Sequence, residues 1–256
     1  DGPWFLGGLI IFAAACALLV LRSMWAVPRV GVRLDGAGAL RFGLNSALVS
    51  AALALIAFAW SWLRLPPALE VKPYYEVLFW GGGHVLQFTW TLLMLVAWLW
   101  LADAIGATLP LSPRIATLFF GVGLVSVFAT PVIYLAWDIV SLQHYRYLTW
   151  IMRFGGGLAI LPFALAVGIG LATLRAMPGE GRPVRAALIA SMVLFVSGGL
   201  IGFAIEGNNV KIPAHYHGCI VGVTLALMGL VYHLLPRMGF AAVPARAASL
   251  QAWLYG

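Results

Sequence analysis

Long apolar stretches constrain this chain more than any other feature of its sequence. A membrane-spanning helix needs about 20 mostly apolar residues, and seven stretches come close to or exceed that length. They run over Trp4–Leu21, Leu44–Leu63, Val77–Leu101, Ile115–Trp137, Tyr147–Leu174, Ala186–Ile205 and Ile212–Leu235. None of the first six contains Asp, Glu or Lys. The pattern predicts an all-α fold, a polytopic transmembrane helix bundle of about seven spans, because lipid accepts only helices or closed barrels.

The composition excludes whole classes of function. Hydrophobic residues make up 63% of the 256 residues and charged residues only 9%, whereas a soluble domain carries about 25% charged residues. A soluble enzyme and a nucleic-acid reader are therefore excluded, and the net charge of +7 is no sign of a nucleic-acid partner. We expect one transmembrane domain over residues 1–256, with membrane lipid around it.

The two ends of the sequence resemble cut points. The chain starts at Asp1 without an initiator Met or a signal peptide, and residues Arg246–Gly256 have the character of another helix that is just beginning. We therefore expect a domain that is truncated at both ends.

Lys and Arg are divided unequally between the two sides of the predicted bundle. Ten of the 15 basic residues fall on one side: Arg22, Arg29, Arg33, Arg41, Arg114, Arg175, Arg182, Arg185, Arg237 and Arg246. The other side carries Arg64, Lys72, Arg146, Arg153 and Lys211. Since cytoplasmic loops are richer in Lys and Arg, the first set is predicted to face the cytoplasm.

Four of the five histidines are predicted at similar depth, in the outer part of the bilayer. They are His84, His144, His215 and His217, and they come from three different spans. Polar groups at membrane depth are expensive and are usually functional, and imidazole is the commonest metal ligand. The fifth, His233, lies at the opposite end of its span and is interpreted as structural.

The pair His215-Tyr216-His217 is the most informative of these features. Two positions along an α-helix turn through about 200°, so the two rings point to nearly opposite faces. They are poorly placed to share one metal ion. Each is free to serve a different cofactor, and this geometry suits two hemes on either side of one helix.

These motifs resemble those of subunit I of the heme-copper oxidases, a superfamily that includes cytochrome oxidases and nitric oxide reductases. Ile212-Pro-Ala-His-Tyr-His-Gly218 is similar to the start of the family's tenth helix, and Trp80–Phe88 to its sixth. Gln143-His144-Tyr145 stands where the family has a His-His pair. The resemblance implies that the seven spans are the fourth to tenth helices of a larger twelve-helix bundle.

The resemblance also implies cofactors. His215 would be the proximal ligand of a high-spin heme and His217 an axial ligand of a low-spin heme. His84 and His144 would bind the non-heme metal, which is copper in oxidases and iron in nitric oxide reductases. Because Gln143 replaces one family histidine, only two imidazoles remain, and we expect this metal to be weakly bound or absent.

Two further residues are candidate catalytic groups. Oxidases of the commonest type have a Tyr four positions after the histidine of helix six, and nitric oxide reductases have a Glu there, whereas this chain has Phe88. Gln87 lies beside that position, and Tyr134 is the nearby phenol in a place similar to that of oxidases with a tyrosine one helix later.

The implied function is that of an oxidoreductase enzyme of a respiratory chain, passing electrons from a low-spin heme to a heme–metal centre that reduces oxygen. Nitric oxide is the alternative substrate. A degenerate homologue acting as an electron conduit or assembly partner is another possibility, and a seven-helix receptor or transporter comes from a third class. Expected partners are segments or subunits that supply the missing helices, and a cytochrome c or quinol donor. The expected location is the bacterial inner membrane, with the metal site toward the periplasm.

Overall fold

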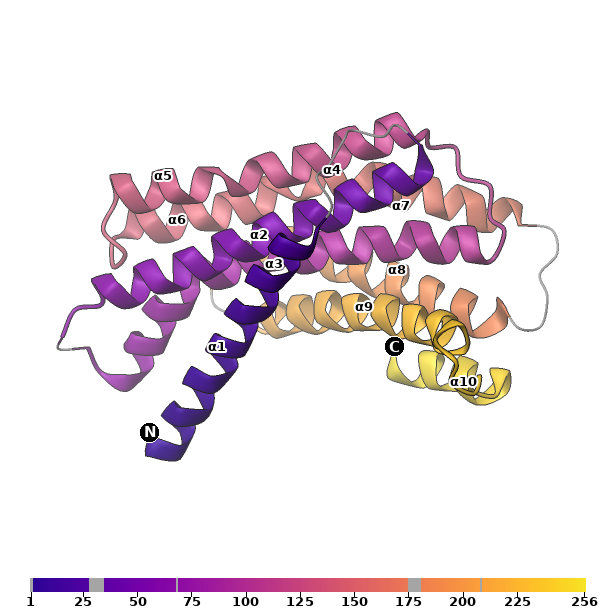
Figure 1. Ribbon diagram of the computed structural model, residues 1–256. Coiled ribbons are helices and arrows are strands. Elements are labelled where there is room, and N and C mark those ends of the chain that lie inside the picture. The colour runs from indigo at the N-terminus through magenta and orange to yellow at the C-terminus, as the bar shows by residue number, and fades with distance from the viewer. Residues whose placement is uncertain (1, 28–34, 68, 175–180, 208) are drawn as a thin grey trace. The chain divides into compact units, whose positions relative to one another are not determined.

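A computed structural model describes residues 2–27, 35–67, 69–174, 181–207 and 209–256, and it is helical without a strand over these ranges (Figure 1). Seven helical segments are long and apolar enough to cross a membrane: Pro3–Ala26, Gly36–Arg64, Val71–Ala104, Pro113–Ala136, Leu142–Thr173, Arg182–Phe203 and Lys211–Leu234. The predicted polytopic α-helical membrane fold is confirmed. Arg29, Arg33 and Arg175, which contribute to the predicted orientation, lie outside the described residues.

Five of the seven spans are single helices. These are α1 (Pro3–Ala26), α2 (Gly36–Arg64), α3 (Val71–Ala104), α8 (Arg182–Phe203) and α9 (Lys211–Leu234). After α9 come a short 3-10 helix, η3 (Pro236–Met238), and α10 (Ala245–Tyr255). The helix that was expected to begin near Arg246 is therefore present as α10.

The fourth span is broken where the sequence predicts one continuous helix. It consists of α4 (Pro113–Val127) and α5 (Ala129–Ala136). Pro131 lies in the first turn of α5. Because proline has no N–H, it cannot donate the helical hydrogen bond to the carbonyl of Val127. The break at Phe128 puts proline where its missing N–H is tolerated.

The fifth span changes its winding part of the way along. It begins as α6 (Leu142–Trp150), continues as a π-helix, η1 (Ile151–Gly155), and ends as α7 (Gly157–Thr173). The side chain of Ser141 caps α6 by accepting the backbone N–H of His144 at 3.2 Å. Short π-helical turns inside α-helices are uncommon and are frequent at functional sites.

The described chain forms two compact units. The first comprises Asp1–Leu92 and Phe120–Gly156, and the second comprises Leu93–Phe119 and Gly157–Gly256. In the first unit, the buried face of α2 is a stripe of small residues at helical spacing, made up of Ala39, Gly43, Ser46, Ala47, Ser50, Ala51, Ala54, Ala57 and Ser61. Small side chains let helices approach closely in a membrane. Ser50 Oγ donates to the carbonyl of Val85 on α3 at 3.3 Å and accepts from Thr89 Oγ1 at 3.0 Å.

In the second unit α8 packs along α9, and α10 packs against both. Its buried apolar cluster is Ala186, Ala187, Ala190, Leu225 and Ala252. Ser191 on α8 donates to the carbonyl of Gly222 on α9 at 2.6 Å and accepts from Trp98 Nε1 at 2.8 Å. The hydroxyl of Ser191 and the indole N–H of Trp98 are thus paired across helix interfaces, as a lipid environment favours.

Candidate functional site

Three of the predicted site residues in the first unit belong to one aromatic and imidazole cluster. The ring of Tyr134 on α5 meets the ring of His144 on α6 edge-on, with centroids 4.7 Å apart. Trp80 on α3 lies 4.6 Å from the ring of His84 and 4.6 Å from that of Tyr145. The ring of Tyr145 in turn lies 6.4 Å from that of His144. The structure therefore brings His84, His144 and Tyr134 into one region.

The ring of His84 is held in a defined tautomer. Its Nδ1 lies 2.6 Å from the carbonyl oxygen of Trp80, one turn earlier on α3. A carbonyl can only accept a hydrogen bond, so Nδ1 carries the proton and Nε2 of the neutral ring carries the lone pair. Metal-binding histidines commonly have this second hydrogen bond, which fixes the ring and makes the other nitrogen available.

His144 is the most deeply buried of the candidate ligands. Only 1% of its surface is exposed, and its Nδ1 is buried with no hydrogen-bond partner among the described residues. Leaving a buried polar atom unpaired typically costs about 1–3 kcal/mol. Coordination of a metal ion would satisfy such a nitrogen, so His144 fits the role of a ligand.

Tyr134 is held by two neighbours that sequence reasoning missed. Its hydroxyl lies 2.8 Å from Ser61 Oγ on α2, and any side-chain carbon at Gly81 would collide with that hydroxyl. Ser61 is the last member of the small-residue stripe on α2, and this spacing was the available signal for a buried serine. Gly81 therefore makes room for a side chain, as Gly82 does for the ring of Phe58.

Gln87 is less closely tied to this cluster. It is half-buried on α3, three positions after His84 and therefore on a similar side of the helix. Its predicted catalytic role stays a prediction.

In the second unit, His215 makes a hydrogen bond to the neighbouring helix. Its Nδ1 lies 2.7 Å from the carbonyl oxygen of Gly198 on α8, so Nδ1 is again the donor and Nε2 holds the lone pair. A side-chain carbon at Gly202 would come within 2.7 Å of that Nδ1. Gly202 thus makes room for the ring of His215, while Gly198 lets the backbone of α9 come close to α8.

His217 faces a different environment from His215. Its Nδ1 lies 2.7 Å from the carbonyl of Pro213 on its own helix. The residue lines a cavity of about 300 Å³, together with Gly198, Gly218, Tyr255 and others. Gly198 borders both rings, as the acceptor for His215 and as part of the lining beside His217. That the two rings serve separate cofactors stays a prediction.

The four histidines predicted as ligands are divided between the two compact units. His84 and His144 belong to the first unit, and His215 and His217 to the second. That His84, His144 and His215 surround one cavity stays a prediction. Among the described residues no group of three or more His, Cys, Asp or Glu side chains could hold a metal ion.

The fold defines the chain as a polytopic α-helical membrane protein. It is 30% identical to an uncharacterized protein of Rickettsia prowazekii (strain Madrid E), over 75% of this chain and 44% of the relative. It is 27% identical to an uncharacterized protein of Aquifex aeolicus (strain VF5), over 93% of this chain and 58% of the relative. The chain thus spans about half the length of the curated relatives it matches. No protein-family model and no solved structure matches.

Proposed function

We propose that this chain is the central part of a heme-binding membrane oxidoreductase that resembles the terminal oxidases and reduces oxygen. In this proposal His215 and His217 hold a high-spin and a low-spin heme, and His84 and His144 offer a weak site for copper or iron. The site faces the outer side of the membrane, in agreement with the uneven distribution of Lys and Arg. The missing helices and an electron donor come from other segments or subunits.

The observation that carries the proposal is the hydrogen bond from His215 to the carbonyl of Gly198. It leaves Nε2 as a lone-pair donor on a ring whose direction is fixed by a second helix. His84 and His217 have the same arrangement with their own helices. Three candidate ligands therefore favour the one tautomer that can coordinate a metal through Nε2.

The glycines of the second unit serve two different purposes. Gly202 leaves room for the ring of His215, whereas Gly198 and Gly218 let the backbones of α8 and α9 approach each other closely. The cavity beside His217 is lined largely by apolar or small residues. Bound heme would supply the redox chemistry, while the chain provides axial ligation and a dry environment.

The first unit offers a proton-bearing group beside the two imidazoles. Tyr134 is 3% exposed, and its hydroxyl is held by Ser61. In the proposed function this phenol gives a proton to the substrate, and Ser61 is its positioning residue.

Gln143 supports a second candidate function, a heme-bearing protein that carries electrons without reducing oxygen. It stands where the similar family has another histidine, and amide oxygens bind soft copper poorly. Nitric oxide reduction is the third reading, because iron accepts oxygen ligands more readily than copper(I) does.

A reduced-minus-oxidised optical spectrum of the protein, purified together with the segments or subunits that supply the missing helices and combined with metal analysis, tests the proposal. We expect heme signals of both spin states. His217→Ala should remove the low-spin signal alone, and His215→Ala the high-spin signal alone. His233→Ala, on the same helix, is the matched control and should remove neither. A purified, folded chain that binds no heme when heme is supplied would contradict the proposal.

A further inference from the structure

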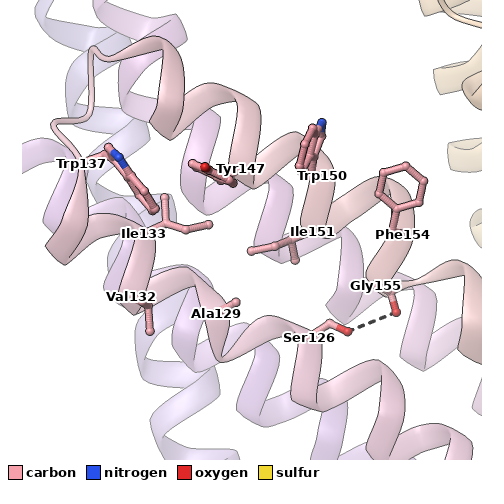
Figure 2. A pocket seen from close by; sticks show the side chains of 10 residues that line it. All are labelled: Ser126, Ala129, Val132, Ile133, Trp137, Tyr147, Trp150, Ile151, Phe154 and Gly155. Carbon is pink, nitrogen blue, oxygen red and sulfur yellow. Dashed lines mark hydrogen bonds between the residues drawn. The ribbon is translucent and has the colours of Figure 1, made fainter.

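An aromatic groove in the first unit is separate from the histidine cluster. It is a cavity of about 500 Å³ between α4–α5 on one side and α6–η1 on the other. Figure 2 shows Ile133, Ala129 and Ile151 along the space between these helices. At one end Ser126 Oγ lies 3.3 Å from the carbonyl of Gly155, and this contact joins the two walls.

The sequence explains why the helices separate here. One wall is broken at Phe128, ahead of Pro131, and the other is wound as a π-helix over Ile151–Gly155. Both departures change the path of a helix relative to a regular α-helix. Two regular α-helices would pack their side chains against each other, whereas this pair leaves the apolar groove between them.

Toward its other end the groove is aromatic, and a cation lies over one of its lining rings. The rings of Trp137 and Tyr147 are stacked with centroids 4.4 Å apart. The guanidinium carbon of Arg146 lies 4.6 Å from the ring centre of Trp150, which also lines the groove. The nearby carboxylate of Asp138 accepts the backbone N–H of Val140 at 3.0 Å, within its own turn. Trp, Tyr and Arg together are typical of the boundary between lipid tails and headgroups.

The groove has the length of one leaflet. From Ser126 to Trp137 the chain advances eleven positions, or about 16 Å at 1.5 Å per residue. The hydrocarbon core of a bilayer is about 30 Å thick, so one leaflet is about 15 Å. The lining is apolar along this length, and the guanidinium of Arg146 lies over the ring of Trp150, one of the lining residues.

We propose that this groove binds one glycerophospholipid, with an acyl chain between the helices and its phosphate on Arg146. The charge of the guanidinium complements a phosphodiester, and a neutral lipid lacks the group that it recognises. The acyl chain of the lipid would cover Trp150 and Phe154, which are half-exposed. The lipid would fill the gap that the proline break and the π-helix create.

Native mass spectrometry of the purified chain, after removal of its lipids, tests this proposal. The probes are dioleoyl phosphatidylglycerol and dioleoylglycerol, which have the same acyl chains and differ in the headgroup. We expect one phosphatidylglycerol to be retained per chain and dioleoylglycerol to bind at least about tenfold more weakly, since a bond to a charged group is worth 1.5–3 kcal/mol.

Two variants and their matched controls locate the lipid. Arg146→Gln should weaken retention of phosphatidylglycerol about tenfold, while Arg64→Gln, an exposed arginine predicted on the same side, should leave it unchanged. Ala129→Trp should fill the groove and abolish retention, while Val125→Trp adds the same bulk outside the lining. Equal retention of both probes, or full retention in Arg146→Gln or Ala129→Trp, would overturn the proposal. So would a groove that retains neither lipid, as expected if a further helix of a longer chain occupies it.

Discussion

Tyr134 and Ser61 share a hydrogen bond of 2.8 Å although 73 positions of sequence separate them. Both side chains are buried, at 3% and 0% exposure, and they join α5 to α2. Because no water is available inside a membrane protein, each of these two hydroxyls depends on the other as its hydrogen-bond partner. The bond therefore contributes both to the packing of the first unit and to the direction of the only phenol assigned a catalytic role.

Removing one partner of this pair should destabilise the first unit. We expect Ser61→Ala to lower the free energy of unfolding by about 1 kcal/mol, because the phenol loses its hydrogen-bond partner. Ser46→Ala is the control, since Ser46 Oγ bonds to the carbonyl of Phe42 within its own helix. Unfolding in increasing denaturing detergent measures the difference, and a double-mutant cycle with Tyr134→Phe isolates the pair. Equal effects of the two serine variants would count against a special role for Ser61.

A methyl group at Gly81 should displace Tyr134. We expect Gly81→Ala to destabilise the protein, because the added carbon collides with the phenol hydroxyl. Gly83→Ala is the matched control, since nothing lies within 4 Å of a carbon added there. Alanine is the better helix former by about 0.5–1 kcal/mol, so the control should be neutral or slightly stabilised. The thermal midpoint of the purified chain distinguishes the two, and a stabilised Gly81→Ala would refute the prediction.

The close approach of α8 and α9 should control the position of His215. A carbon added at Gly198 would lie 2.8 Å from the backbone nitrogen of Cys219 on α9. We expect Gly198→Ala to separate the helices, to weaken the bond to His215 and to reduce the proposed high-spin heme signal. Gly199→Ala meets nothing within 4 Å and should keep the signal. Optical spectra of the two variants, compared at equal protein concentration, check this outcome.

Adding a histidine beside His144 should strengthen the proposed metal site. We expect Gln143→His to raise the bound copper or iron toward one per chain, since imidazole is a far better ligand for soft metals than an amide. The double variant with His144→Ala should lose this gain. Elemental analysis after dialysis gives the stoichiometry. One firmly bound copper in the unmodified protein, with oxygen reduction at the rate of an oxidase, would show that the expectation of a weak site is wrong.

Hydropathy alone was sufficient to predict the seven spans, because burial of the backbone in lipid leaves a continuous apolar stretch few alternatives to a helix. It could not predict the break at Phe128 or the π-helix at Ile151–Gly155. Pro131 is compatible with either a kink or a first turn, and only packing against other helices decides between them.

In the candidate site, too, the sequence was sufficient for some features and insufficient for others. Residue type and depth were enough to single out His84, His144, His215 and His217, because charged or titratable groups are rare in spans. The partners of these residues were not predictable. The acceptor for His215 is a backbone carbonyl on another helix, and no side chain in the sequence marks its position. The bond between Ser61 and Tyr134 likewise depends on a helix pairing that a single sequence does not encode locally.

The carbonyl that holds His215 has a consequence for genetics. Every amino acid at position 198 would present the same oxygen, so no replacement deletes the acceptor. A scan that converts side chains to alanine would find His215 but would read Gly198 only as a steric defect. The orientation of the ring therefore depends on the main chain and not on the side chain at position 198. Only substitutions that move α8 relative to α9 can change this orientation, and we expect natural variants with such an effect at the glycines between the two helices.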